Sequence, residues 1–519
     1  MIPARGLWEL VEARAAATPD LLFAVDDQDR RLDFAGYRDA ALRAAAGLAD
    51  LGVRTETRVS WVLPTTLDAM VLCAALARLG AVQNPILPIY RAREVRFITR
   101  QTAARFLCVP GAWRGFDYAA MAREIAAEQP GLRVLDVSQG LPEGDPAALP
   151  AAADPGPAAS APVRWHFYTS GTTADPKGAK HTDATLLASF RGLVRVLELT
   201  PEDRHGLVFP FTHVGGIGWL LAGLLAGMAH VVVPVFDPKT TIPLLARHGV
   251  TLAGAGTAFH QAYLAAQRAA PGSRLFPRLR ALPGGGAPKP PALHGECKAW
   301  LGGVGIVSGY GLTECPIIAM NSVRDPDDKL AHTEGRPNPP EAQISVVKPD
   351  GSLARPGEEG ELRIRGPQLC RGYVDGALDA EAFDERGFFR TGDLGLVDAQ
   401  GYVAITGRLK DVIIRKGENI SAREVEDLLF EHPKVADVAV IGLPDPASGE
   451  RCCAVVSCRD PGDPLGFDEM VAFLRRRGLM IQKIPEQLER VDAVPRNAAG
   501  KIQKHELRQR FGGATGGRA

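Results

Sequence analysis

A stretch rich in hydroxyl side chains and glycine, residues 168–178, is the part of the sequence best suited to chemistry. It reads Tyr168-Thr-Ser-Gly-Thr-Thr-Ala-Asp-Pro-Lys-Gly178 and ends an extended run that begins at Val163. Glycines let backbone N–H groups turn toward a ligand, hydroxyls add donors and Lys177 adds positive charge, so the stretch could cradle a polyphosphate. An ordinary Gly/Thr-rich surface turn is the alternative. The spacing differs from G-x-x-x-x-G-K-[ST], because Lys177 lies between Pro176 and Gly178.

Five later segments combine glycine turns with charged or aromatic residues. They are Leu282-Pro-Gly-Gly-Gly-Ala-Pro288, Ser308-Gly-Tyr-Gly-Leu-Thr-Glu314, Phe389-Arg-Thr-Gly-Asp393, Ile405-Thr-Gly-Arg-Leu-Lys-Asp411 and Pro495-Arg-Asn-Ala-Ala-Gly-Lys-Ile502. A carboxylate such as Glu314 suits a hard cation, and the aromatic face of Tyr310 suits a purine. The Asp393 carboxylate offers two acceptors to a vicinal diol. Taken singly, each segment also has a structural explanation as a turn, a cap or solvated surface.

In this order, the segments resemble the motifs of the adenylate-forming (ANL) superfamily, which contains acyl-CoA synthetases, carrier-loading adenylation domains and luciferases. The phosphate loop of that family reads roughly [Y/F]-T-S-G-[ST]-T-G-x-P-K-G, and Ala174 stands where the family usually has glycine. The resemblance implies a set of ATP- or AMP-binding residues: Thr169, Ser170, Gly171, Thr172, Thr173, Lys177, Gly285, Gly286, Ala287, Pro288, Gly309, Tyr310, Gly311, Thr313, Asp393 and Arg408.

The resemblance also implies individual roles around the nucleotide. Tyr310 is expected to stack on adenine, and Thr313 to hydrogen-bond a phosphate or the acyl carboxylate. Glu314 is expected to hold Mg²⁺. Asp393 is expected to accept hydrogen bonds from both ribose hydroxyls, with Arg408 contacting the same sugar.

Lys501 is the expected catalyst of adenylation. Attack of a carboxylate on the α-phosphate brings two anions together, and a cation delivered to that point offsets the charge that develops. The resemblance places a hinge at Lys410 and a loop that moves toward the pantetheine tunnel at Gly417. The implied catalytic set is therefore Lys501, Thr313, Glu314 and Gly417.

The segment Phe209-Pro-Phe-Thr-His-Val-Gly-Gly-Ile-Gly218 matches the part of the family that supplies an aromatic or histidine gate to the acyl pocket. His213 is the candidate gate, and a satisfied core histidine is the alternative. The expected pocket residues are His213, Val214, Gly215, Gly216 and Gly309. Missing side chains there, and at Gly254 and Gly256, are expected to widen the cavity for a bulky or medium-size acid. The stretches contain no lysine or aspartate that would pair with an amino acid's α-ammonium group.

Length and composition limit the classes of protein. A chain of 519 residues is too long for one core, and its formal net charge of zero gives no global attraction to nucleic acid. The 8 cysteines are scattered, which favours buried thiols in a reducing compartment. The longest apolar run, 217–236, is broken at 227–230, so a core helix feeding a buried strand is favoured over a membrane span. With charged residues near the N-terminus instead of a signal peptide, we expect a cytoplasmic protein and a possible homodimer.

The pattern of elements predicts an α/β fold. Strands at 58–63 and 106–109 alternate with helices at 67–79 and 94–102, which indicates parallel sheets covered by helices. Residues 141–162 read as a loop, and short strands after 335 indicate a β-rich subdomain. A capping box at Ser421–Glu424 opens a helix in a small α+β unit. The expected domains are 1–407 and a mobile 412–519, joined by a hinge at 408–411.

These expectations converge on an ATP-dependent carboxylic acid–CoA ligase that acts through an acyl-adenylate and uses ATP, Mg²⁺ and coenzyme A. Its partners would be a small-molecule carboxylic acid, ATP and CoA, with no nucleic acid and no membrane span. Loading of a carrier protein is one alternative. Because Ala174 departs from the loop pattern, an enzyme efficient only in thioester formation from an acyl-adenylate is another. A nucleotide-binding protein without activity is a third.

Overall fold

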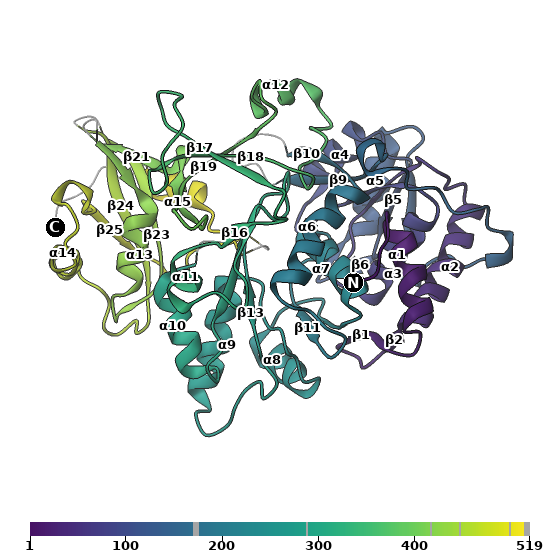
Figure 1. The fold of residues 1–519 in the computed structure, drawn as a ribbon, viewed down its shortest axis with the longest axis horizontal. Helices are drawn as coiled ribbons and strands as arrows, with labels where there is room; N and C mark the ends of the chain where they lie inside the picture. Colours follow the sequence, from purple (N-terminus) through teal and green to yellow (C-terminus); the bar gives the residue numbers. More distant parts are fainter. Residues whose placement is uncertain (170–175, 287–288, 416–417, 446–447, 498–499, 513–519) are drawn as a thin grey trace.

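The computed structural model describes residues 1–169, 176–286, 289–415, 418–445, 448–497 and 500–512. A large α/β region holds the N-terminal elements, and a smaller unit holds the C-terminal ones (Figure 1). The antiparallel strands β17 to β20 lie between the two in the view of Figure 1. The prediction of a large α/β domain followed by a smaller α+β domain is confirmed.

A six-stranded sheet forms the first half of the large region. In spatial order its strands are β10 (Lys177–Thr182), β9 (Val163–Thr169), β4 (Val82–Pro85), β3 (Arg58–Trp61), β5 (Phe106–Val109) and β8 (Arg133–Asp136). All neighbours pair in parallel except β10, which is antiparallel to β9. Successive side chains enter different cores, with Phe106 on one face and Leu107 on the other. The sheet is thus buried on both faces, as its continuous apolar strands predict.

Helices cover both faces of this sheet. One group contains α1 (Leu7–Ala17), α2 (Phe34–Asp50), α3 (Leu67–Arg78), α6 (Asp183–Val196) and α7 (Val214–Ala226), and the other contains α4 (Ala92–Gln101) and α5 (Tyr118–Glu128). The Thr182 hydroxyl caps α6 by accepting from the Thr185 N–H at 3.1 Å, so that this helix starts directly after β10. A short hairpin of β6 (Ala112–Trp113) and β7 (Phe116–Asp117) precedes α5.

Two further sheets complete the α/β part. The first contains β11 (Arg204–Leu207), β12 (Ala229–Val232), β1 (Leu22–Asp26) and β2 (Arg31–Asp33), and the second contains β13 (Leu282–Gly284), β14 (Ile306–Tyr310), β15 (Ala319–Met320) and β16 (Arg336–Pro337). Helices α8 (Pro238–Arg247), α9 (Thr257–Ala269), α10 (Pro291–Trp300) and α11 (Asp327–His332) belong to this part. Helix α7 ends at Gly227 and leads into β12, which confirms the interpretation of the long apolar run. Among the described residues, no helix is long and apolar enough to cross a membrane.

The predicted β-rich part is a four-stranded antiparallel sheet. It contains β17 (Gln343–Val347), β18 (Gly360–Arg365), β19 (Phe389–Val397) and β20 (Val403–Arg408), with the short helix α12 (Asp379–Ala382) nearby. The strand β19 was not predicted from the sequence, and Asp393 lies within it. Residues Leu409–Asp411 form a 3₁₀ turn where the hinge is expected; motion at this turn stays a prediction.

The C-terminal unit is built on β22 (Glu418–Ser421), β21 (Val412–Arg415), β24 (Gly449–Cys458), β23 (Val435–Asp445) and β25 (Gln487–Arg490), with helices α13 (Ala422–Phe430), α14 (Phe467–Arg476) and α15 (Lys504–Gly512). The predicted capping box is half present. The Ser421 hydroxyl accepts from the Glu424 N–H at 3.4 Å, but the Glu424 carboxylate binds Lys483 at 2.6 Å instead of closing the box. All eight cysteines are free thiols and seven are buried, as expected.

Gly335 joins α11 to β16 in a left-handed conformation, with φ of 82°. We expect Gly335→Ala to lower the free energy of unfolding by at least about 2 kcal/mol, because a Cβ there would lie 1.9 Å from the backbone carbon of Met320. Gly351→Ala is the matched control, since Gly351 has φ of 83° and a Cβ added to it would meet nothing within 4 Å. The control should lose only the roughly 1 kcal/mol of left-handed strain. Equal shifts of the apparent Tm in the two variants would contradict the prediction.

Candidate active site

The β9–β10 hairpin carries the predicted phosphate loop at its tip. Thr169 ends β9 and is paired in register with Lys177 of β10. The Tyr168 ring is buried, and its hydroxyl donates to Gln101 at 2.7 Å. The predicted loop residues Ser170, Gly171, Thr172 and Thr173 lie outside the described residues, as does Ala174. The described strands therefore place both ends of this loop at the edge of the six-stranded sheet.

The two glycine-rich segments predicted on the adenine side lie next to each other. Strands β13 and β14 are parallel neighbours, with Gly284 paired to Ser308. A Cβ on Gly285 would lie 3.0 Å from the Gly309 carbonyl oxygen, so the two backbones approach closely. Gly286 follows directly, whereas Ala287 and Pro288 lie outside the described residues. The chain thus has the small residues that a flat base would require at this position.

The segment after β14 is a tight loop that returns to β15. The Leu312 N–H donates to the Cys315 carbonyl at 2.9 Å, and the Ile318 N–H donates to the Tyr310 carbonyl at 2.7 Å. A Cβ on Gly311 would lie 2.0 Å from the Pro316 carbonyl oxygen, which leaves room only for glycine. This loop presents Tyr310, Thr313 and Glu314 on one short stretch.

Asp393 is buried at the centre of a charged group. Its Oδ2 accepts from the Tyr310 hydroxyl at 2.6 Å, and its Oδ1 accepts from the Arg408 Nε at 2.6 Å. The second contact follows from topology, because Asp393 of β19 is paired in register with Arg408 of β20. Burial and the Asp393 carboxylate raise the pKa of Tyr310, so its hydroxyl stays protonated and donates. Three predicted nucleotide-binding residues are therefore brought together.

Glu314 is buried and held from two sides. Its Oε1 accepts from the Tyr373 hydroxyl at 2.6 Å, and its backbone carbonyl accepts from the Cys370 N–H at 2.8 Å. The preceding carbonyl, that of Thr313, contacts His181 Nε2 at 2.9 Å. No group of three or more His, Cys, Asp or Glu side chains that could hold a metal occurs among the described residues. Mg²⁺ usually binds one or two carboxylates together with substrate phosphates, so Glu314 fits an ion that arrives with ATP.

Lys501 reaches this group from the C-terminal unit. A turn closed by the Lys501 N–H on Asn497 Oδ1, at 2.9 Å, presents the lysine, and Arg496 anchors the turn to Asp437 of β23 at 2.9 Å. Burial and then the nearby Arg408 lower the pKa of Lys501, whereas Asp393 and Glu314 raise it in part. The lysine thus lies within electrostatic reach of Arg408, Asp393 and Glu314.

Lys410, the predicted hinge residue, lies beside the same group. Burial and the Arg408 guanidinium lower its pKa, while Asp411 and Asp393 act in the opposite direction. Gly417, the remaining predicted catalytic residue, lies outside the described residues.

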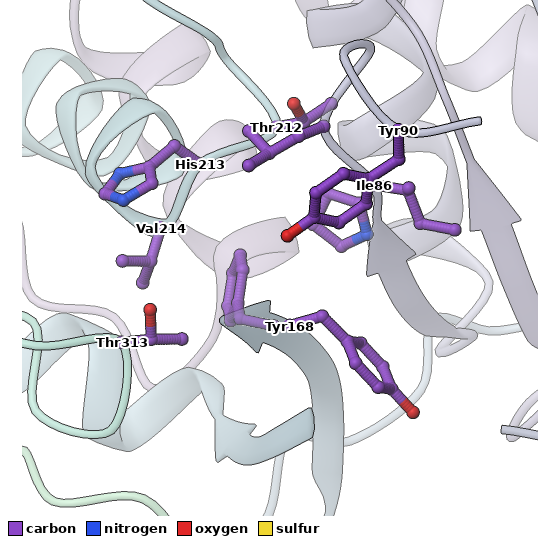
Figure 2. Close-up of a pocket in the computed structure, with 10 residues that line it drawn as sticks. Ile86, Tyr90, Tyr168, Thr212, His213, Val214 and Thr313 are labelled. Carbon is purple, nitrogen blue, oxygen red and sulfur yellow. The ribbon is translucent and has the colours of Figure 1, made fainter. Parts of the chain in front are cut away.

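A narrow cavity adjoins Thr313 (Figure 2). His213, Val214 and Thr313 lie on one side of it, with Tyr90 and Ile86 on the other. His213 caps α7 by accepting from the Gly215 N–H at 3.1 Å. Burial, helped by the charge of Lys501, lowers the pKa of His213 to about 4, so the ring is neutral at pH 7. His213 is therefore both a satisfied helix cap and a wall of the cavity that lies within electrostatic reach of Lys501.

Two of the glycines that were expected to widen this cavity, Gly216 and Gly254, lie close to backbone atoms. A Cβ on Gly216 would lie 2.5 Å from the Phe211 carbonyl oxygen, and one on Gly254 would lie 2.0 Å from the Pro283 carbonyl oxygen. Glycine at these two positions prevents backbone clashes, and widening of the pocket by its glycines stays a prediction. The side chains that the sequence analysis missed, Ile86 and Tyr90, follow β4. Their signal was their place after the carboxyl end of a parallel strand, where α/β sheets bind ligands.

Comparison with known proteins agrees with this geometry. A family model described as "AMP-binding enzyme" matches residues 11–374, and one described as "AMP-binding enzyme C-terminal domain" matches residues 424–501. Medium-chain fatty-acid–CoA ligase of Escherichia coli (strain K12) is 31% identical, over 97% of this chain and 91% of its own length. Salicyl-AMP ligase / salicyl-S-ArCP synthetase of Mycobacterium tuberculosis is 33% identical, over 99% of this chain and 92% of its own.

The fold is also that of a solved relative. ATP-bound MatB from Rhodopseudomonas palustris superposes with a TM-score of 0.87 at 28% identity, covering 98% of this chain and 99% of its own. The matches span both the large region and the C-terminal unit. The chain therefore belongs to the AMP-binding enzymes of the adenylate-forming superfamily and is an AMP-forming ligase that activates an acid with ATP.

Proposed function

We propose that the protein is a carboxylic acid–CoA ligase that forms an acyl-adenylate and then a CoA thioester. The observation that supports this most directly is the position of Lys501. A lysine from the C-terminal unit lies within electrostatic reach of Asp393, Glu314 and Arg408, and also of His213, which lines the cavity that adjoins Thr313. Such a group can bind a nucleotide and offset negative charge at one point next to a bound acid.

In the first half-reaction, an oxygen of the acid's carboxylate attacks the α-phosphorus of ATP. The bond from the α-phosphorus to the bridging oxygen breaks, and pyrophosphate leaves with the electron pair. Asp393, oriented by Arg408 and Tyr310, accepts hydrogen bonds from the ribose. Lys501 offsets the charge that builds on the phosphorus oxygens. Mg²⁺, when held by Glu314 and the phosphates, neutralises charge on the triphosphate.

In the second half-reaction, the thiolate sulfur of CoA attacks the acyl carbonyl carbon, and AMP leaves with the electron pair of its bond to that carbon. The thiol's proton passes to solvent. In this step negative charge develops on the acyl oxygen and on the departing AMP oxygen instead of around a five-coordinate phosphorus, and we propose that the C-terminal unit turns about Lys410 between the two half-reactions. The turn would withdraw Lys501 and bring in the Gly417 loop. A switch between two closed states allows one site to serve both reactions.

Two cations near β21 bear on the choice between CoA and a carrier protein. Recognition of an acidic carrier would draw on exposed, uncommitted cations in this region. The Arg415 guanidinium instead pairs with Glu486 at 2.5 Å, and Lys483 pairs with Glu424 at 2.6 Å. The relative from Escherichia coli is named for CoA and that from Mycobacterium tuberculosis for an ArCP, so carrier loading is the second candidate.

The acceptor can be tested directly. The enzyme would be incubated with ATP, Mg²⁺ and a panel of medium-chain fatty acids and benzoates, and then offered either CoA or a phosphopantetheinylated carrier. We expect mass spectrometry to show the CoA thioester. Acylation of the carrier alone would overturn the CoA proposal, and absence of any acyl-adenylate would overturn the whole function. Supplying synthetic acyl-adenylate tests Ala174, since a large gain over the ATP-driven reaction would point to an enzyme efficient only in the second step.

The residues that line the cavity indicate the kind of acid that it can bind. Ile86, Leu87 and Val214 offer apolar surface, and Tyr90 and Phe167 offer aromatic surface. We therefore propose an organic acid of medium size whose carboxylate lies toward Thr313 and whose remainder is apolar.

A further inference from the structure

Residues 370–374, referred to below as the 370–374 segment, connect the phosphate-loop hairpin to the Glu314 carboxylate. The segment runs along the free edge of β10. The Lys180 N–H donates to the Gly372 carbonyl at 2.9 Å, and the Arg371 N–H donates to the Lys180 carbonyl at 2.7 Å. The Val374 N–H donates to the Gly178 carbonyl at 2.7 Å. The segment therefore pairs with the hairpin whose tip is the predicted phosphate loop, through an isolated antiparallel bridge between Tyr373 and Ala179.

The same segment holds Glu314 through both its backbone and its side chain. The Cys370 N–H donates to the Glu314 carbonyl at 2.8 Å, and the Tyr373 hydroxyl donates to Oε1 at 2.6 Å. Between a phenolic hydroxyl and a carboxylate, the hydroxyl is the donor. A carboxylate has about four lone-pair sites, and one donated bond leaves the others for a cation.

The shape of the segment is set by groups outside the nucleotide site. Gly372 has φ of 80°, and a Cβ there would lie 2.4 Å from the Asp379 carboxylate. That carboxylate accepts from the Tyr373 N–H at 2.8 Å. The Lys177 ammonium lies 5.8 Å from the centre of the Tyr373 ring, on the side of the hairpin. Tyr373 thus contacts the base of the phosphate loop and the carboxylate at once.

Building on the proposed function, we propose that Tyr373 is a positioning residue that directs the Glu314 carboxylate toward the divalent cation carried by ATP. The 370–374 segment keeps this carboxylate in register with the phosphate-loop hairpin. A purely structural role would require only the ring, which packs with Cys315, Ile318 and Phe389. The hydroxyl is the part that the proposal concerns.

Tyr373→Phe keeps the ring and removes the hydroxyl. Tyr402→Phe is a matched control, because the buried Tyr402 donates to Asp325 at 2.8 Å away from the nucleotide site. The full-length variants would be titrated with Mn²⁺ in the presence of α,β-methylene-ATP, with free Mn²⁺ followed by electron paramagnetic resonance. This readout needs neither acid nor CoA, so it is independent of which acceptor the enzyme uses.

We expect the Kd for Mn²⁺ to rise about tenfold in Tyr373→Phe, the lower end of the usual cost of removing a partner of a metal-binding carboxylate. The Tyr402→Phe control should bind Mn²⁺ as the unmodified enzyme does, while both variants show similar shifts in apparent Tm. Equal Mn²⁺ affinity in Tyr373→Phe and the unmodified enzyme would overturn the proposal. Unchanged affinity in Glu314→Gln would overturn it as well, without bearing on the CoA assay.

Discussion

Lys501→Ala is expected to slow acyl-adenylate formation by about 10²–10³-fold, the usual effect of removing one group that stabilises charge in a transition state. The lysine lies within electrostatic reach of Asp393, Glu314 and Arg408, where the α-phosphate would have to lie. Thioester formation from synthetic acyl-adenylate and CoA should be much less affected, because in that step bonds form and break at the acyl carbon and not at phosphorus. The two half-reactions would be measured separately, by pyrophosphate release and by thioester formation.

Two comparisons separate this effect from a general loss of fold. Lys483→Ala removes a surface lysine that pairs with Glu424, and it should retain both half-reactions. Lys501→Arg keeps a cation whose pKa lies far above that of lysine. Because burial lowers the pKa of Lys501, kcat/KM for ATP should fall at alkaline pH in the unmodified enzyme, below the ordinary range of lysine, but not in Lys501→Arg. A similar alkaline fall in both enzymes, or equal losses in the two half-reactions of Lys501→Ala, would contradict the assignment.

The sequence predicts most of the fold because its strongest patterns are local. The continuous apolar strands at 58–61 and 106–109 are buried on both faces, as their patterns predict. Strand β19 was not predicted, because Arg390, Gly392 and Asp393 interrupt its apolar pattern and its pairing with β18 and β20 holds it as a strand. The Glu424 side chain shows the same limit, since its partner Lys483 is 59 positions away.

In the site, the sequence motifs identified the expected nucleotide-binding residues, but they did not identify the residues that hold these side chains in place. Tyr310, Asp393 and Arg408 carry recognisable motifs, and the register of β19 and β20 brings them together. Tyr373 lies 59 positions from Glu314, and His181 lies 132 positions from Thr313. Such contacts depend on which sheet edges meet, and no spacing along the chain encodes that. Gly254 is a further example, because a Cβ there would meet the Pro283 backbone of another segment.

Asp393→Asn should raise KM for ATP by about 10–100-fold, since a hydrogen bond to a charged group contributes about 1.5–3 kcal/mol. Asparagine has one carbonyl oxygen and one NH₂ group, whereas the two Asp393 oxygens now accept from Tyr310 and Arg408. The NH₂ group would face a donor on one side, so the ribose would lose an acceptor and its orientation. The apparent Tm should also fall, because Arg408 loses its counterion; the loss is limited by the exposure of 37% of the Arg408 side chain.

Asp398→Asn is the control for that loss of stability. Asp398 follows the same strand and pairs with Lys329 at 2.6 Å, away from the nucleotide site. Its substitution should lower the apparent Tm while leaving KM for ATP unchanged. Ligand-induced stabilisation also separates the loss of fold stability from the loss of ATP binding. At a fixed concentration, an ATP analogue raises the Tm of a variant more the more tightly that variant binds it. The analogue should stabilise Asp398→Asn as it does the unmodified enzyme, and Asp393→Asn much less. Equal stabilisation of both variants by the analogue would show that Asp393 stabilises the fold and does not orient the nucleotide.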